Sequence, residues 1–254
     1  MHAVIAVALH KPGTIPIFPL YLPVQAGAAV NPNLHLTRDD TGENISARNG
    51  LYCELTAHYW LWKNVQADVY GLCHYRRYFT TKPLGRSMDC ILSQRELEKA
   101  LENADVIVPR PRIYLIETNA SHYAHAHHPA DLAALREVIS EICPEYLPAH
   151  DRVMARRWGR RFNMFIMRRE QFESYSAWLF GVLFPLEKRL GPDVPPRTMG
   201  FIAERLMDVW VEHHRPRIRR MRVLHTEGQH WPRRIAGFLK RKFIPAKNRK
   251  VAKK

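Results

Sequence analysis

The sequence predicts an α/β protein in which a layered sheet is flanked by helices. Two observations lead to this prediction: short apolar runs alternate with longer stretches of helical periodicity, and 254 residues combine with 46% apolar content. Alternation of short strands with helices is typical of a sheet that carries helices on its faces. A chain of this size can bury a sizeable core, so one catalytic-sized domain is expected.

The N-terminal elements follow from apolar patterning. VIAVAL at 4–9 predicts a central strand that ends before the turn-prone PGTIP. From Ser46 to Lys63 the apolar residues adopt helical spacing, and one face carries Leu51, Leu55, Tyr59 and Trp62. A second apolar strand is expected at 68–73.

The second half of the chain continues the alternation. Ser93 and Glu96 form a capping box that predicts the start of a helix, and an apolar strand is expected at 105–109. Pro129 suits a first helical turn, and Gly191 suits a helix end. The remaining expected elements are a strand at 163–167 and helices at 129–143, 170–190 and 199–213.

Charge and cysteine content limit the function classes. Residues 213–254 hold 15 Lys and Arg against the single acid Glu227, whereas residues 1–212 hold 24 basic and 23 acidic residues. The four cysteines form no CxxC pair and are expected to be reduced. The N-terminus has no signal-peptide pattern and no segment is apolar enough to span a bilayer, so a cytoplasmic protein is expected.

The stretch GLCHYRRYF at 71–79 places two arginines where a buried strand is expected to open into a loop. Ligands of α/β sheets bind at the carboxyl ends of strands. The guanidinium groups of Arg76 and Arg77 match the geometry of phosphate oxygens, so they are candidates for holding a diphosphate. The alternative is that they pair with carboxylates such as Asp68 or Asp89 and only hold the loop.

Successive stretches of the chain resemble the motifs of the domain of unknown function 4422 family. These stretches are QAGAAV at 25–30, DDTGENISARN at 39–49, YCELTAHYWLWKN at 52–64, GLCHYRRYF at 71–79, NMFIM at 163–167, YSAWLF at 175–180 and GFIAERL at 200–206. The family occurs in capsule, exopolysaccharide and O-antigen loci. The resemblance implies a bacterial glycosyltransferase with an A-type, Rossmann-like mixed sheet over 1–213. It also implies a uridine-diphosphate sugar donor, with galactofuranose as a candidate, and a growing polysaccharide or lipid-linked acceptor.

A-type glycosyltransferases carry an Asp-x-Asp metal motif after such a strand, and this chain has none. We therefore expect no metal cofactor and a donor site in which side-chain cations meet the departing diphosphate. The residues of that expected site are His10, Lys11, His74, Arg76 and Arg77. The alternative is a divalent metal such as manganese, held by Asp40 and Glu43 together with His10 or His74.

Inverting transfer needs a carboxylate base. The first candidate is Glu204, which resembles the acidic residue that opens the acceptor-side helix in inverting A-type enzymes; the alternative is a salt bridge with Arg205 or Arg197. The second candidate is Asp40, because DDTGENIS has turn chemistry. Further donor-site candidates from the motifs are Glu43, Asn44, Ser46 and Asn163.

The stretch SHYAHAHHPAD at 121–131 holds four histidines close enough to chelate a metal, but only one acid is near, which disfavours a zinc site. By the family pattern, the recurring members that would meet substrate are Tyr123, His127 and Asp131. Four tryptophans at helical spacing are expected in the core: Trp60, Trp62, Trp178 and Trp210. Aromatic residues expected in the loop, for stacking on uracil or sugar or for packing, are Tyr75, Tyr78 and Phe79.

The basic segment 214–254 is expected to act separately. RPRIRRMRVLH is typical of an exposed strand, and RRIAGFLKRKFI has the pattern of an interfacial helix on anionic lipid, so the enzyme is expected at the inner face of the cell membrane. A solvated tail is the alternative. Two other function classes stay open: nucleic-acid binding through the tail, which the neutral body disfavours, and a non-catalytic assembly scaffold.

Overall fold

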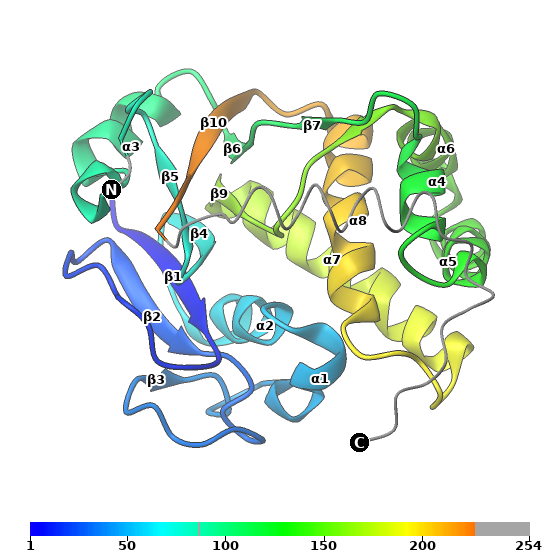
Figure 1. The fold of residues 1–254 in the computed structure, drawn as a ribbon, viewed down its shortest axis with the longest axis horizontal. Coiled ribbons are helices and arrows are strands. Elements are labelled where there is room, and N and C mark those ends of the chain that lie inside the picture. Colours follow the sequence, from blue (N-terminus) through cyan, green and yellow to red (C-terminus); the bar gives the residue numbers. More distant parts are fainter. Residues whose placement is uncertain (86, 227–254) are drawn as a thin grey trace.

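The computed structural model describes residues 1–85 and 87–226, and a mixed β-sheet lies at its centre (Figure 1). The strand order is β3-β2-β1-β4-β5-β10-β6-β9, and β9 also pairs with β4. The strands are β1 (Ala3–Leu9), β2 (Tyr21–Gln25), β3 (Thr37–Arg38), β4 (Val69–His74), β5 (Arg77–Thr80), β6 (Val106–Pro109), β9 (Phe165–Arg168) and β10 (Ile218–His225). The prediction of a mixed α/β protein is confirmed.

One half of the sheet is parallel. Strand β1 pairs in parallel with β2 and with β4, and β2 pairs in parallel with β3. Strand β9 runs antiparallel to β4 and β6. The carboxyl ends of β1, β2 and β4 therefore meet at one edge, which is where ligands of α/β sheets bind.

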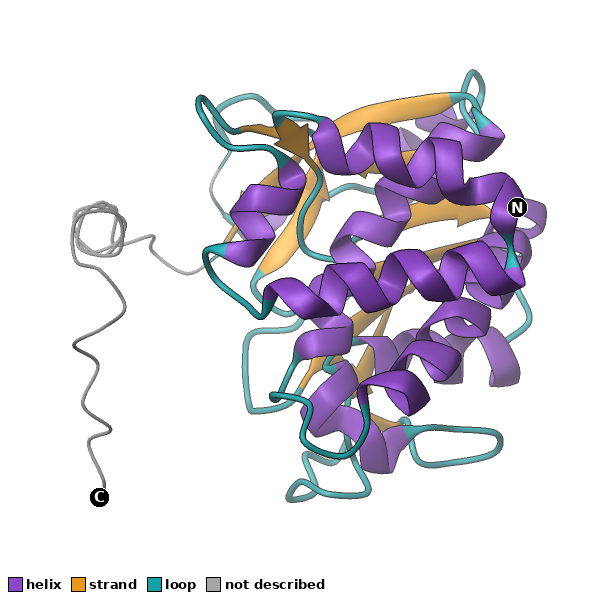
Figure 2. Cartoon of the chain, turned by 90° about the vertical axis from the view of Figure 1, so that its right-hand side faces the viewer, coloured by secondary structure: helices purple, strands orange, loops and turns teal. Residues whose placement is uncertain are grey.

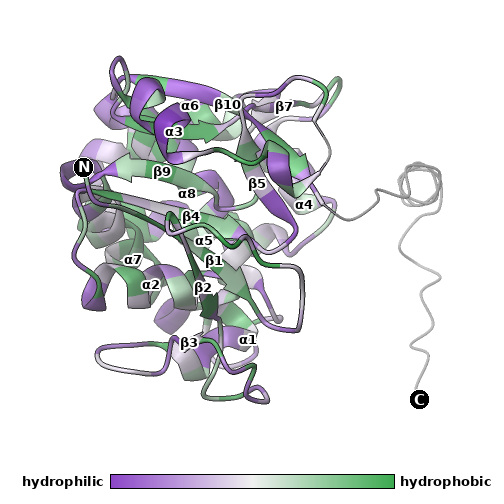
Figure 3. Ribbon diagram, turned by 90° about the vertical axis from the view of Figure 1, so that its left-hand side faces the viewer, coloured by the Kyte–Doolittle hydropathy of each residue, from purple (hydrophilic) through white to green (hydrophobic). Residues whose placement is uncertain are grey.

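The sheet separates two apolar cores, because side chains alternate between its faces. In β1, Ala6 and Ala8 belong to the larger core, whereas Ile5, Val7 and Leu9 belong to the smaller one. The central strands are coloured mainly as hydrophobic in Figure 3. A strand buried on both faces reads as a continuous apolar run, which explains VIAVAL.

Most of the helices cover the larger core, and helices dominate the side of the molecule seen in Figure 2. The helix at 94–101 packs against the smaller core instead. The capping box of Ser93 and Glu96 is present at the start of α3. The helices are α1 (Asn49–Tyr52), α2 (Leu55–Asn64), α3 (Gln94–Leu101), α4 (Asn119–Ala124), α5 (Pro129–Ile142), α6 (Leu147–Ala155), α7 (Arg169–Leu190) and α8 (Thr198–His214). Strands β7 (Arg112–Ile113) and β8 (Trp158–Gly159) form a separate two-stranded sheet, and short 3₁₀ turns cover Ser46–Arg48, Met88–Cys90 and Pro144–Tyr146.

The helical stretch that begins at Ser46 is broken, which the periodicity does not predict. Cys53 separates α1 from α2 with φ 53° and ψ −129°. The side-chain amide of Asn49 donates a 2.8 Å hydrogen bond to the carbonyl oxygen of Cys53 and so stabilises the break. The break places Glu54 at the start of α2.

The stretch GLCHYRRYF forms a strand pair rather than an open loop, so the expected loop is wrong. Strand β4 continues to His74, a turn covers Tyr75 and Arg76, and Arg77 already belongs to β5. Tyr78 and Phe79 are fully buried, so they pack and do not form a stacking platform.

The stretch expected to be an exposed strand is β10, which lies inside the sheet between β5 and β6. The sheet thus extends past the boundary expected at residue 213. The expected interfacial helix falls within 227–254, outside the described residues.

Candidate functional site

A group of polar side chains gathers at the carboxyl end of β4 and at the start of α2 and α8. We call Glu54, His74, Asn163 and Glu204 the carboxylate cluster. Glu54 follows the break after α1, Asn163 precedes β9, and Glu204 lies in the second turn of α8. Helices α1 and α8 lie side by side, which brings these separate segments together (Figure 1).

Asn163 links the start of α2 to α8. Its side-chain Nδ2 donates to Glu54 Oε1 at 2.8 Å and to the carbonyl oxygen of Gly200 at 2.9 Å. Since both partners are acceptors, the amide orientation is determined. Asn163 thereby fixes the Glu54 carboxylate relative to α8.

His74 is held in one tautomer. Its Nε2 lies 2.5 Å from the carbonyl oxygen of Phe162, so Nε2 carries the hydrogen and donates. The same nitrogen is 3.7 Å from Glu54 Oε1. Burial lowers the pKa of His74, and Arg77 and Arg76 lower it further, whereas the Glu54 carboxylate raises it. His74 is therefore neutral at pH 7, and it positions Phe162 instead of adding positive charge.

Both carboxylate oxygens of Glu204 have partners. Oε1 accepts a 2.9 Å hydrogen bond from the backbone N–H of Phe162, and Oε2 lies 3.2 Å from the guanidinium of Arg205. The salt bridge with Arg205 is the one that the sequence offered as an alternative. Burial nevertheless raises the pKa of Glu204 above the ordinary 4.5, despite the opposing effect of Arg205. A carboxyl group with a raised pKa suits proton transfer.

Backbone strain is concentrated around the carboxylate cluster. Six non-glycine residues of the described chain have positive φ. Four of them belong to the cluster or border it: Asn163 is a member, and Cys53, Phe162 and Arg197 are neighbours. Such conformations cost about 1–3 kcal/mol each and persist where the surrounding structure enforces them. They are typical of sites that must hold functional groups in place.

The expected substrate residues form a second group that adjoins Glu204. The hydroxyl of Tyr123 donates to Asp131 at 2.7 Å, and the ring of His127 lies between those of Tyr123 and Phe201. The Arg205 guanidinium, which pairs with Glu204, lies over the Tyr123 ring. Burial and Arg205 lower the pKa of His127 to about 4, so this imidazole is neutral at pH 7.

Positive charge surrounds His10 at the end of β1. Its ring meets that of Tyr75 edge-on, and its pKa is lowered by burial and then by Arg76, Lys11 and Arg197. The Glu54 carboxylate has the opposite effect and raises the pKa of the same imidazole. The cations therefore neighbour the carboxylate cluster.

Arg76 and Arg77 also contact aromatic rings. The guanidinium of Arg76 lies over Tyr75 and that of Arg77 over Phe162, at 4.7 and 4.3 Å from the ring centroids. Both arginines have further interactions within the protein. The alternative partner Asp68 instead pairs with Arg169.

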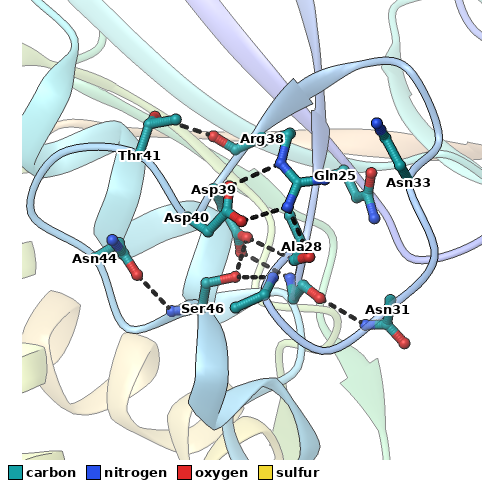
Figure 4. Close-up of polar contacts among 12 residues, drawn as sticks. Gln25, Ala28, Asn31, Asn33, Arg38, Asp39, Asp40, Thr41, Asn44 and Ser46 are labelled. Atoms are coloured by element: carbon teal, nitrogen blue, oxygen red, sulfur yellow. Dashed lines mark hydrogen bonds and ion pairs between the residues drawn. The ribbon is translucent and has the colours of Figure 1, made fainter.

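The DDTGENIS segment forms a separate network (Figure 4). Buried Asp39 accepts hydrogen bonds from the backbone N–H groups of Gly27 and Ala28 and from the Ser46 hydroxyl. Asn44 Oδ1 accepts from the backbone N–H of Ser46. This network holds the loop after β2, in which Gly27 packs on Asn49 of α1.

Two further expected residues are engaged near this network. Asp40 pairs with Arg38, and Glu43 accepts from the Tyr59 hydroxyl at 2.6 Å and lies 3.4 Å from Lys63. Within the described residues, neither carboxylate pairs with His10 or His74 as the alternative metal site requires. No group of three or more His, Cys, Asp or Glu side chains in residues 1–85 and 87–226 is arranged to hold a metal ion.

The histidines of 121–131 bind protein groups. Glu117 accepts from His122 Nδ1 at 2.7 Å and from His125 Nδ1 at 2.9 Å, and His122 Nε2 lies 2.6 Å from Arg161. Of the four tryptophans, Trp60 and Trp210 are buried as expected.

Sequence reasoning missed Glu54. In the sequence, Glu54 stands out only as a charged residue within the apolar stretch YCELTAHYW. A continuous helix was expected there, and in such a helix Glu54 would have no special position. Asn163 was expected at the site, but its function as the link between Glu54 and α8 depends on contacts across the fold.

None of the helices in the described part of the chain combines the length and apolar character needed to cross a bilayer. No curated protein matches the chain. A solved structure described as the apo form of the WbbM bifunctional glycosyltransferase matches it with a TM-score of 0.83 at 27% sequence identity. The match covers 90% of this chain and 46% of that one, so this chain spans about half the length of its structural relative. The family model for the domain of unknown function DUF4422 matches residues 4–215, and the chain belongs to that family.

Proposed function

We propose that this protein is a glycosyltransferase of bacterial surface polysaccharide synthesis, which moves a sugar from a nucleotide-sugar donor to a saccharide acceptor. The observation that carries the proposal is the likeness to a glycosyltransferase structure over 90% of the chain. It is supported by the position of the carboxylate cluster at the strand ends where α/β sheets bind ligands. We further propose that the fold is of the A type.

The proposed donor is a uridine-diphosphate sugar, with galactofuranose as the candidate sugar. Lys11, Arg76 and Arg197 surround His10 with positive charge, which suits a diphosphate. In transfer, the bond between sugar C1 and the diphosphate oxygen breaks and its electron pair leaves with the diphosphate. Fixed cations beside that oxygen stabilise the charge that develops there, so no metal is required in the proposed mechanism.

The acceptor hydroxyl oxygen forms the new bond to C1, and in an inverting reaction its proton passes to a carboxylate. The carboxylate cluster offers two, Glu54 and Glu204. Glu204 is the candidate named from the sequence, and its raised pKa supports a role in proton transfer. Asp40 is a weaker candidate, because its carboxylate is paired with Arg38.

The other proposed site residues divide into two roles. Tyr123, His127 and Asp131 adjoin Glu204 through Arg205, which supports acceptor or donor contact. We assign Ser46, Asn44 and Glu43 to holding the loop after β2 and its surroundings, because their side chains bond protein groups there.

The basic C-terminal segment is proposed to hold the enzyme at the cytoplasmic face of the membrane, where a lipid-linked acceptor would lie. The proposal is supported by 15 basic residues against one acid in 213–254. Flotation of the full chain with anionic but not neutral liposomes is expected. Binding to DNA without liposome binding would favour the nucleic-acid alternative.

The experiment that tests the main proposal is a transfer assay with uridine-diphosphate galactofuranose and uridine-diphosphate galactose as donors and an alkyl galactoside as acceptor. Release of uridine diphosphate that depends on the acceptor, with a glycosylated product, is expected. Absence of transfer, together with absence of nucleotide binding, would leave a non-catalytic scaffold as the better account.

A further inference from the structure

One oxygen of the Glu54 carboxylate is held by the protein, and the other is open. Oε1 accepts from Asn163 Nδ2 at 2.8 Å. Among residues 1–85 and 87–226, no hydrogen bond reaches Oε2. The side chain is 16% exposed, so it keeps contact with solvent. Oε2 is therefore available to a hydrogen-bond donor that enters from outside.

Asn163 presents a second acceptor without a donor. This residue is 4% exposed, and its Oδ1 is buried with no partner in the described chain. Exchanging the oxygen and nitrogen of the amide would not give Oδ1 a partner without losing others, because Nδ2 donates to Glu54 Oε1 and to the Gly200 carbonyl oxygen. Leaving such a group unpaired costs about 1–3 kcal/mol. A water molecule buried between this oxygen and a bound ligand would satisfy it.

Two acceptors without a donor among the described residues, Oε2 of the solvent-accessible Glu54 carboxylate and the buried Oδ1 of Asn163, define the chemistry of the ligand. Glu54 Oε2 and Asn163 Oδ1 both accept hydrogen bonds, so they select a group that donates. A hydroxyl fits this requirement, whereas a phosphate or carboxylate would be repelled. Of the groups on the proposed substrates, a sugar hydroxyl therefore suits this position and the diphosphate does not.

The hydroxyl position adjoins the cations proposed for the leaving group. The Glu54 carboxylate lies 3.7 Å from His74 Nε2, His74 bonds the carbonyl oxygen of Phe162, and the Arg77 guanidinium lies over the Phe162 ring. Consistent with this, Arg76, Lys11 and Arg197 lower the pKa of His10 and the Glu54 carboxylate raises it. A hydroxyl bound to Glu54 therefore lies near the place where the diphosphate departs. Proximity of the attacking and leaving groups is what transfer requires.

We infer that Glu54, rather than Glu204, binds the attacking hydroxyl of the acceptor and takes its proton as the oxygen bonds to C1. This inference rests on the proposed function. Glu54 is then a catalytic residue, and Asn163 is a positioning residue that fixes its carboxylate. Glu204 holds Phe162 and Arg205, since both its oxygens are engaged there.

The test is Glu54→Gln, which keeps the size and the acceptor for Asn163 but replaces the open oxygen by an amide donor. Transfer from uridine-diphosphate galactofuranose to octyl galactoside is expected to fall by about 10²–10⁴-fold in kcat, the range typical of a lost general base. The rise in Tm produced by uridine diphosphate is expected to be unchanged. Glu98→Gln, on the exposed side of α3, is the matched control and keeps full activity.

A loss of less than about tenfold, or loss of the uridine-diphosphate effect on Tm, overturns the assignment of Glu54. Wild-type protein that neither transfers nor is stabilised by uridine diphosphate contradicts the proposed function instead. The two failures are therefore distinguishable.

Asn163→Ala tests the positioning role. It is expected to lower kcat with little change in the KM for the donor, and to add nothing to the loss in Glu54→Gln. Such non-additivity is the mark of two residues that act as one unit. If the two substitutions lower kcat independently, so that their effects add in the double variant, Asn163 does not position Glu54.

Discussion

The backbone N–H of Phe162 donates a 2.9 Å hydrogen bond to Glu204 Oε1, which ties the segment before β9 to α8. The carbonyl oxygen of the same residue accepts from His74, and its ring lies under the guanidinium of Arg77. Phe162 has a φ of 84°, a conformation that these three contacts hold in place. The strained segment thus joins β4, β5 and α8 around the carboxylate cluster.

The loop after β2 is predicted to control the position of Glu54 indirectly. Gly27 has a φ of 70°, and a Cβ atom there would lie 2.4 Å from Cγ of Asn49, which stabilises the break before Glu54. Gly27→Ala is expected to cost about 1–3 kcal/mol of unfolding free energy and to lower transfer activity. Denaturant unfolding measures the first effect.

Gly181→Ala is the control for that substitution. Gly181 lies on an exposed position of α7, and no atom of residues 1–85 and 87–226 comes within 4 Å of an added Cβ. Alanine there is expected to stabilise the protein by about 0.5–1 kcal/mol. Equal effects of the two substitutions would contradict the role given to the loop.

The buried pair of Arg160 and Asp208 is predicted to be essential for stability. Asp208 accepts from the backbone N–H of Arg160 at 2.8 Å and pairs with its guanidinium, and both side chains are almost fully buried. Asp208→Asn leaves a buried cation uncompensated and is expected to cost about 3–5 kcal/mol in urea unfolding.

The exposed pair of Arg189 and Glu141 provides the comparison. Glu141→Gln is expected to change the unfolding free energy by less than about 1 kcal/mol. If Asp208→Asn costs no more unfolding free energy than Glu141→Gln, the pair of Arg160 and Asp208 is not essential for stability.

Glu204 is predicted to make the stability fall as pH rises. Burial raises its pKa in the folded protein above the ordinary 4.5, so the folded state favours the protonated carboxyl. Its contribution is fully present below pH 4.5 and is lost as pH rises through the folded-state pKa. The Tm of Glu204→Gln relative to wild type should therefore increase between pH 4.5 and pH 8, as calorimetry can measure. A constant difference in Tm would contradict a raised pKa.

His127 is predicted to have the opposite pH dependence. Its pKa is lowered from 6.5 to about 4, so the folded state favours the neutral ring. The stabilising contribution is present above pH 6.5 and is lost as pH falls toward 4. His127→Gln should flatten the decline in Tm over this range, and an unchanged decline would show that other groups cause it.

Local patterns predicted much of the fold. The capping box of Ser93 and Glu96 and the apolar runs at β1, β4, β6 and β9 are visible in the sequence because each depends on residues near one another in the chain. The expected resemblance to a glycosyltransferase family also agrees with the family and the structural relative.

Long-range pairing was not predictable in the same way. The basic and apolar alternation of β10 is typical of an edge, yet it pairs with both β5 and β6, which lie more than a hundred residues earlier in the chain. The role of Glu54 likewise depends on Asn163 and on the break at Cys53, which the helical period of 46–63 conceals.

The central claim is that side-chain cations at the ends of β1 and β4 bind the diphosphate of the donor next to the carboxylate cluster. Its most direct test is the Tm of the full chain with uridine diphosphate in the presence of a chelator. We expect a rise in Tm that persists in chelator and is lost in Arg76→Ala and reduced in Arg77→Ala, while both variants stay folded. No rise without added manganese, or a full rise in both variants, would contradict the claim.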